Sequence, residues 1–438
     1  MEGLPKLTLM STSNGLMRGG INSKLAEYFN LNNVSKGACS SGLGLYTLAS
    51  HENIFDSDYI IVDFAINDNE HLKQGWINES HLEEVADRLY SILSLSGVKV
   101  FVLLMPVYTY LSDPLKSEGV KLHLKLAEKY NFQVINGYDF VASSSLEDKS
   151  SMFVDFAHLD RVTASTFGDV IADHILQNYP TSNKTPTTPT FELSEVIRAL
   201  LPDSFETSGT YTSKGSSVGM YECIELRESE TINISVPSEF YVNGIMVNAN
   251  SKAKISIDTG KEIIVKDIYS GGLSDDKVEV KYIPFQTPLS CKNLTIKIAD
   301  FGDEVTEKSP RSRKKLSSQH YGHADIFGVL ISREEFTLPH VLDRSDYSGC
   351  LPSFRPVNSA RLKLLDEFED AVNKSAYGEM ADLLRELSLV FERHNRYLSA
   401  EKTIHLAEKL RPEGPVIKGI KNRISKVAKQ RKLLFKQK

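Results

Sequence analysis

Residues 7–20 read LTLMSTSNGLMRGG, a run of apolar residues that ends abruptly in serine, threonine, asparagine and glycine. Such an ending fits two kinds of turn. In an ordinary strand-to-helix turn a serine caps the following helix, whereas in some enzymes the turn carries a nucleophilic serine. The run alone favours the cap, so the rest of the chain has to decide between the two.

The stretch from residue 6 to residue 178 alternates apolar runs with helical patterns. Continuous apolar runs at 58–66, 98–107 and 131–137 are typical of parallel strands that are covered on both faces. This alternation predicts a doubly wound α/β domain. Ligands bind such sheets at the carboxyl ends of the strands. Three segments are expected at that edge: residues 11–15, 64–70 and 105–110.

Three polar segments of this domain supply the groups that acyl transfer by a serine needs. Ser13 offers a hydroxyl, and His158 in VDFAHLDR (residues 154–161) offers an imidazole that can take its proton. Asp155 precedes His158 by three residues, so in a turn it can reach the ring and fix its tautomer. Asn67, in the segment DFAINDNE, can donate its amide to the oxyanion beside the backbone N–H of Ser13.

A fourth segment, VSKGACSSGLGL at residues 34–45, contains Gly37. A glycine lets the backbone approach a ligand closely and present its N–H, so Gly37 is a candidate third oxyanion donor. Each of these residues alone has a plainer explanation as a cap, a turn residue or a surface pair. Their order along the chain, each at an expected strand end or loop, favours a catalytic site.

This order of motifs resembles that of the SGNH (GDSL-type) hydrolase superfamily over roughly residues 6–178. The resemblance implies a flavodoxin-like three-layer fold and serine-dependent ester chemistry. It also implies that Ser13, and not Ser11, is the nucleophile, with Asp155 and His158 completing the triad and Gly37 and Asn67 in the oxyanion hole. One departure stands out, because Ser11-Thr12 occupies the place of the family's usual Gly-Asp.

Three further residues near these segments are candidates for binding the substrate: Asn14, Arg18 and Asp68. An exposed surface role for Arg18 and a turn role for Asp68 are the alternatives. We expect the histidines outside the motif (among them His51, His71, His81 and His174) to be structural. The sequence predicts no metal site and no bound cofactor, because it lacks metal-ligand clusters and glycine-rich nucleotide motifs.

The pattern changes after a linker rich in proline and threonine at residues 180–190. Short alternating runs split by turn residues predict an antiparallel β-sandwich over 191–340, of a kind that is common in carbohydrate recognition. A polar, basic stretch at 307–323 is expected to be a loop. Residues 341–438 are expected to be helical.

Part of this helical region resembles one tetratricopeptide repeat, and a plain helical hairpin is the alternative. The residues that carry this resemblance are Leu384, Leu387, Ser388, Phe391, Ala400, Ile404, Ala407 and Pro412. The final stretch, 411–438, has ten Lys or Arg against one acid, with isoleucines on one helical face. Such a basic amphipathic helix can lie on an anionic membrane surface or dock on a protein partner, or it can be the solvated end of the last packed helix.

The composition indicates where such a protein works. The net charge of -6 argues against nucleic acid as a partner. Four cysteines without metal or disulfide spacing, the absence of a secretory signal pattern and the absence of a long apolar span predict a cytoplasmic protein, with a peripheral place at the inner membrane face as a further option.

Three functions remain open at this level. The first is O-acetylation of a bacterial surface or capsular polysaccharide from acetyl-CoA through an acyl-Ser13 intermediate, which the variant first motif, the β-domain and the helical tail favour by resemblance. The second is a carbohydrate acetyl esterase, which uses the same residues with water as the acceptor. The third is an inactive glycan-binding scaffold, against which the presence of the triad residues argues.

Overall fold

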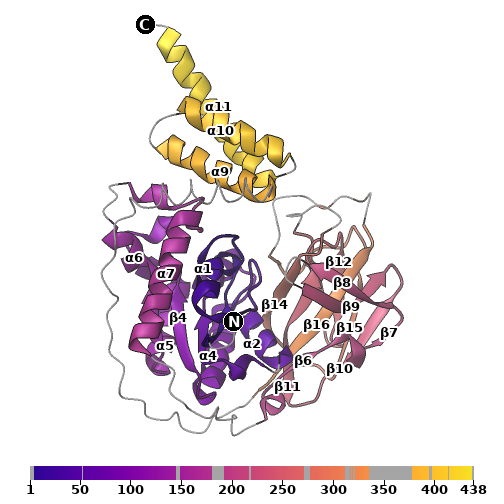
Figure 1. Ribbon diagram of the computed structural model, residues 1–438. Helices are drawn as coiled ribbons and strands as arrows, with labels where there is room; N and C mark the ends of the chain where they lie inside the picture. Colours follow the sequence, from indigo (N-terminus) through magenta and orange to yellow (C-terminus); the bar gives the residue numbers. More distant parts are fainter. Residues whose placement is uncertain are drawn as a thin grey trace.

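The computed structural model has three parts, an α/β part, a β-rich part and a helical part (Figure 1). It describes residues 4–51, 53–144, 148–179, 192–216, 219–270, 277–310, 316, 318, 321–334, 377–393, 397–412 and 414–436. The predicted linker at 180–190 and the start of the predicted helical region at 341–376 lie outside the described residues, as do Cys350 and much of the predicted loop at 307–323.

The first part is built on a five-stranded parallel sheet with the strand order β2-β1-β3-β4-β5. The strands are β1 (Lys6–Met10), β2 (Asn30–Asn33), β3 (Tyr59–Val62), β4 (Lys99–Leu104) and β5 (Gln133–Asn136). The helices are α1 (Ile21–Tyr28), α2 (Ser41–Ser50), α3 (Ala65–Gln74), α4 (Glu79–Leu95), α5 (Glu118–Lys129), α6 (Gly137–Ser143) and α7 (Arg161–Asn178).

Alternate residues of the central strands enter two separate cores, one on each face of the sheet. On β3, Ile60 and Val62 pack on the side of α2, α4 and α5, whereas Tyr59 and Ile61 pack on the side of α1 and α7. Because both faces are covered, the strands are apolar throughout. The predicted doubly wound, three-layer α/β fold is therefore confirmed.

Two local features differ from the expectation. Strand β2 has the polar sequence NLNN, which carried no apolar signal because it is a partly exposed edge strand that pairs only with β1. The apolar run at 58–66 is only in part a strand. Strand β3 ends at Val62 and helix α3 begins at Ala65, which places Asn67 in the first helical turn and not at a strand end.

The second part consists of two packed antiparallel sheets, with the strand orders β13-β12-β15-β10-β7 and β14-β11-β16-β9-β8, the latter extended by β6. Apolar side chains of both sheets face each other in a single core, so the predicted antiparallel sandwich is confirmed. The strands are β6 (Ile197–Leu200), β7 (Glu206–Thr207), β8 (Thr210–Ser216), β9 (Gly219–Arg227), β10 (Thr231–Ser235), β11 (Phe240–Asn248), β12 (Lys254–Asp258), β13 (Ile263–Asp267), β14 (Val280–Leu289), β15 (Asn293–Ile298) and β16 (His323–Arg333).

The sandwich is packed firmly on the α/β part. Apolar side chains of β11, β14 and β16 join the core that lies between the parallel sheet and helices α2 and α4. Tyr282 lies so close to Gly42 of α2 that a Cβ at this position would overlap its ring. The buried His81 of α4 lies with Nδ1 3.1 Å from the Phe285 carbonyl oxygen and Nε2 3.2 Å from Asn243 Oδ1. The two parts therefore share one continuous core.

The third part contains α9 (Tyr377–Arg393), α10 (Tyr397–Leu410) and α11 (Pro415–Lys436). The small residues Ala400 and Ala407 are fully buried where α9 and α10 pack together. Ile417, Ile420 and Ile424 of α11 join the same core, so the apolar face of the basic helix is covered over its first half. No helix in the described ranges combines the length and apolar character that crossing a bilayer requires.

Candidate functional site

The carboxyl edge of the parallel sheet collects the residues that the sequence singled out. Met10, the last residue of β1, pairs in register with Val62, the last residue of β3, so the segments that follow these two strands start side by side. A short 3-10 helix, η1 (Ser13–Gly15), follows β1. Gly37 lies between β2 and α2, and His158 lies just before α7.

Ser13, His158 and Asp155 form a hydrogen-bonded chain. Ser13 Oγ lies 2.7 Å from His158 Nε2. His158 Nδ1 lies 2.9 Å from each carboxylate oxygen of Asp155. With the Nδ1 proton directed at the carboxylate, Nε2 is left as an acceptor for the serine hydroxyl, which is the arrangement of a nucleophile, a base and an orienting acid.

A tight turn holds the acid and the base together. Phe153 and Leu159 form an antiparallel bridge, and the Val154 N–H donates to the His158 carbonyl oxygen at 2.9 Å. Asp155 Oδ1 also accepts the N–H groups of Ala157 (2.8 Å) and His158 (2.9 Å). Because Asp155 and His158 are three residues apart in this turn, the turn brings the carboxylate next to His158 Nδ1.

These contacts keep Asp155 ionised. Its partial burial would raise the pKa of the carboxyl group. The hydrogen bond and the charge of His158, together with the two backbone N–H donors, outweigh that effect and hold the pKa of Asp155 below its ordinary value. The carboxylate is therefore available to stabilise an imidazolium when His158 takes a proton.

Asn67 offers a donor that is free in the resting protein. Its amide nitrogen Nδ2 is buried and has no hydrogen-bond partner among the described residues. A buried polar group without a partner is costly and asks for an explanation. A donor kept for a transient oxyanion is one explanation, because preorganised donors of this kind stabilise transition states.

The loop that carries Gly37 is tied to the helix that carries Asn67. His71, one turn further along α3, lies with Nε2 3.2 Å from the Ala38 carbonyl oxygen. Burial lowers the pKa of His71 to about 4, so the ring is neutral. Ala38 has a φ of 56°, a left-handed conformation that a non-glycine residue adopts only when its surroundings hold it there. His71 is thus a structural residue that helps to position the Gly37 loop.

A buried pair beneath the nucleophile turn was not recognised from the sequence. Ser11 Oγ donates to Asp63 Oδ2 at 2.7 Å, and the Ser11 N–H donates to Ser35 Oγ at 3.1 Å. Burial raises the pKa of Asp63 to about 7 against the opposing hydrogen bond from Ser11. Ser11 and Asp63 each directly follow one of two neighbouring strands. The sequence feature that could have indicated this pair is Asp63, an acid that directly follows the buried apolar strand Tyr59–Val62.

Two of the three candidate substrate-binding residues, Asp68 and Asn14, are buried. Asp68 is fully buried and accepts the Ser41 N–H (2.8 Å) and hydroxyl (2.5 Å) at the start of α2, and its Oδ2 lies 2.8 Å from His123 Nε2. Its contacts are those of a helix cap inside the core. Asn14 leaves only 4% of its surface exposed, so it has little surface to offer a substrate.

Arg18 connects the nucleophile turn to the helical part of the chain. Its guanidinium lies 2.6 Å from Glu379 and 3.9 Å from Asp382, both on α9. Val154, which directly precedes Asp155, packs on the core of the same helical part. Figure 1 shows α9, α10 and α11 above the α/β part, with α9 the nearest of the three. The helical part therefore contacts two of the segments that form the candidate site.

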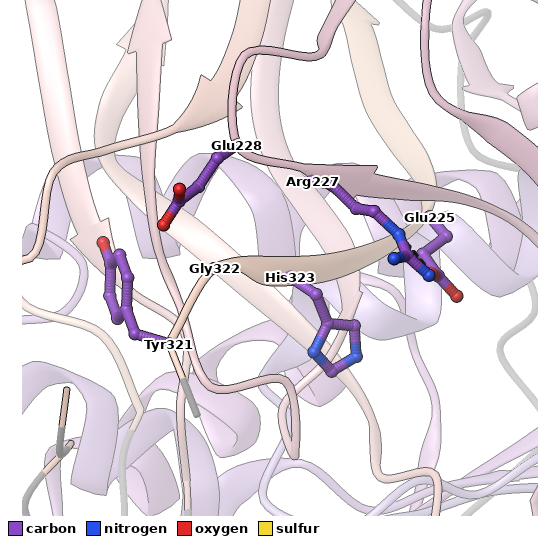
Figure 2. Close-up of a pocket in the computed structure, with 6 residues that line it drawn as sticks. All are labelled: Glu225, Arg227, Glu228, Tyr321, Gly322 and His323. Atoms are coloured by element: carbon purple, nitrogen blue, oxygen red, sulfur yellow. Dashed lines mark hydrogen bonds and ion pairs between the residues drawn. The ribbon is translucent and has the colours of Figure 1, made fainter. Parts of the chain in front are cut away.

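A separate hollow of about 590 Å³ lies on the sandwich (Figure 2). It is open and polar, and no triad residue lines it. Glu225 in this hollow is already paired with Lys214 (3.0 Å) and Arg227 (2.8 Å). The lining residues are Glu225, Arg227, Glu228, Tyr321, Gly322 and His323.

Comparison with known proteins gives a likeness in fold. No family model and no curated protein sequence matches the chain. Among solved structures, the chain is similar to a two-domain esterase active on acetylated mannans, which has also been crystallised with mannopentaose. The identity is 12%, the match covers 76% of this chain and 92% of that chain, and the TM-score is 0.50.

Smaller structures match less of the chain. An acetyl xylan esterase is 13% identical over 40% of this chain and 99% of its own, with a TM-score of 0.32. A lipase/acylhydrolase from Enterococcus faecalis is 15% identical over 41% of this chain and 100% of its own, also with a TM-score of 0.32. At such identities, the likeness to the two-domain esterase shows a shared fold.

Proposed function

We propose that this protein is a serine esterase that removes acetyl groups from an O-acetylated glycan. The observation that carries the proposal is the chain of hydrogen bonds from Ser13 through His158 to Asp155, with 2.7 Å between the serine oxygen and the imidazole. A serine hydroxyl becomes a competent nucleophile when an adjacent base can take its proton.

The first half of the reaction forms an acyl-enzyme. Ser13 Oγ attacks the ester carbonyl carbon while His158 Nε2 takes the hydroxyl proton, and Asp155 stabilises the imidazolium. The tetrahedral oxyanion accepts hydrogen bonds from the Asn67 amide and from the backbone N–H groups of Ser13 and Gly37. The C–O bond to the sugar then breaks, and the sugar oxygen leaves with the proton from His158.

The second half regenerates the serine. A water molecule gives a proton to His158 and attacks the acyl carbon, and the same donors hold the second oxyanion. Collapse of this intermediate releases acetic acid and returns the proton to Ser13 Oγ. If a sugar hydroxyl took the place of water, the outcome would be transfer to a glycan, the reaction favoured by the sequence resemblance, with acetyl-CoA as the donor.

One observation favours the esterase. A structural neighbour with a TM-score of 0.50 is a two-domain esterase active on acetylated mannans, and the likeness extends beyond the α/β part, since it spans 76% of this chain. Nothing comparable supports acetyl-CoA as a donor, so we place transfer second.

The test is an acetate-release assay on acetylated glycans, run beside an acetyl-transfer assay with labelled acetyl-CoA and the deacetylated glycans. We expect acetate release by the wild type, and a fall of at least a thousandfold in Ser13→Ala, because loss of a triad nucleophile removes the acyl-enzyme route. A Ser11→Ala variant is the matched control for a neighbouring buried serine. Full activity of Ser13→Ala would refute the site, and label transfer without acetate release would replace the esterase with a transferase.

A further inference from the structure

Exposed apolar side chains of the α/β part gather at the edge of the sheet that carries the triad. Among the described residues up to Tyr179, the large apolar side chains left exposed are Tyr108 (44%), Leu115 (54%) and Phe156 (62%). Tyr108 and Leu115 lie in the segment after β4, and Phe156 lies between Asp155 and His158. Single exposed apolar residues are ordinary, but a group confined to one functional edge points to a ligand.

Tyr108 and the backbone of Phe156 are tied to the turn that carries Asp155 and His158. The Tyr108 N–H donates to the Phe156 carbonyl oxygen at 2.8 Å. The Tyr108 ring packs edge-on against Phe153, with 5.7 Å between the ring centroids. The turn that contains Phe156 is closed by the carboxylate of Asp155, which accepts the Ala157 N–H. Tyr108 and Phe156 are therefore neighbours through the turn that carries His158.

The chemistry of the two side chains fits a sugar ring. The faces of aromatic rings carry partial negative charge, and the C–H groups on one face of a pyranose carry partial positive charge. Stacking of this kind needs no charge on the ligand, and it orients the ring so that a substituent points to one side. Because Phe156 lies between Asp155 and His158 in the chain, a sugar that stacks on its ring would lie beside the turn that carries His158.

We propose that Phe156 and Tyr108 form a stacking subsite for a pyranose of the glycan, and that they make the enzyme selective for acetylated sugars over small esters. This inference rests on the proposed function, because it names the substrate feature that the Ser13 site recognises. A second protein chain is the other possible occupant of such a surface, and it is an outcome of the test.

The experiment compares two substrates, p-nitrophenyl acetate and acetylated manno-oligosaccharides, in the wild type, Phe156→Ala and Tyr108→Ala. A stacked aromatic pair contributes about 0.5–1.5 kcal/mol, which is about 2–12-fold in binding. We expect each alanine variant to lower kcat/KM for the oligosaccharide about five- to tenfold more than for p-nitrophenyl acetate, chiefly through KM. Phe156→Trp should restore the selectivity, and Tyr211→Ala, at a tyrosine 50% exposed on β8, should leave it unchanged.

A binding measurement separates this proposal from the proposed function. Calorimetry with Ser13→Ala protein and the same acetylated oligosaccharides reports binding without turnover, and we expect affinity to fall when Phe156→Ala is added. Equal losses on both substrates would overturn the subsite, as would absence of oligosaccharide binding or self-association that Phe156→Ala abolishes. Activity that survives Ser13→Ala would refute only the catalytic role of Ser13. The calorimetry would still test the subsite, because it measures binding and not turnover.

Discussion

Replacing Asn67 with alanine should separate catalysis from stability. The Asn67 amide nitrogen is buried and has no partner among the residues that the structure describes, so its removal breaks none of the hydrogen bonds that these residues make to it. Relief of an unsatisfied donor is worth about 1–3 kcal/mol, which offsets the loss of packing from a shortened side chain. We expect the free energy of unfolding to change by less than about 1 kcal/mol.

The effect on the reaction should be much larger. Removal of one oxyanion donor lowers kcat by about 10²–10³-fold, or about 2.7–4 kcal/mol of transition-state stabilisation. The ester carbonyl of the ground state accepts weaker hydrogen bonds than the oxyanion does, so the loss should appear in kcat with little change in KM. The assay is hydrolysis of p-nitrophenyl acetate over a range of concentrations, together with urea unfolding of the same preparations.

Asn69 is a matched control on the same helix. Its Oδ1 accepts the Glu118 N–H at 3.0 Å, and its Nδ2 donates to Tyr110 Oη at 3.4 Å. Asn69→Ala should therefore cost about 1–2 kcal/mol of stability and leave kcat within about threefold. If Asn67→Ala kept kcat within threefold of the wild type, or lost as much stability as Asn69→Ala, the oxyanion assignment would be refuted.

Two further predictions concern the turn beneath the nucleophile. The raised pKa of Asp63, about 7 against an ordinary 3.8, means that the stability contributed by its protonated form is complete below about pH 4 and is lost as the pH rises through 7. Between pH 4 and pH 8, the free energy of unfolding measured with urea should fall by about 4 kcal/mol more in the wild type than in Asp63→Asn. An equal dependence on pH in the two proteins would contradict a raised pKa of Asp63. A Cβ on Gly15 would stand 2.8 Å from Ser11 Cβ and closer still to Ser35 Oγ. Gly15→Ala should therefore cost about 1–3 kcal/mol in thermal unfolding and slow hydrolysis, and an unshifted melting temperature would show that the turn can relax.

The α/β fold could be predicted because its signal is local. Strands buried on both faces read as apolar runs, and covering helices repeat at three or four residues. Strand β2 was not predicted, because it is an edge strand with only one paired neighbour, and such a strand can be polar. The start of α3 was misplaced for a related reason, since the apolar residues Phe64 and Ala65 continue the pattern of β3 while the backbone has already turned.

The site was predictable to the extent that it is local or ordered along the chain. Asp155 and His158 meet through a turn of four residues, so their spacing carried the information. The contrast between Asn67 and Asp68, adjacent in sequence, was out of reach. The Asn67 amide nitrogen has no partner in the described part of the chain, whereas Asp68 is a buried cap, and the difference depends on how α2 and α5 pack against α3.

The segment Ser11-Thr12-Ser13 shows what could be predicted from the sequence and what required the tertiary structure. The sequence by itself determined that a strand ends just before residues 11–15. It also showed that Asp155 and His158, spaced as in a catalytic site, follow much later in the chain. The resemblance predicted Ser13 as the partner of His158, but only the tertiary structure showed the 2.7 Å contact between them and the hydrogen bond of Ser11 to the buried Asp63. The physical reason is that hydrophobic periodicity is written in neighbouring residues, whereas a hydrogen bond across 145 residues depends on strand register and helix packing.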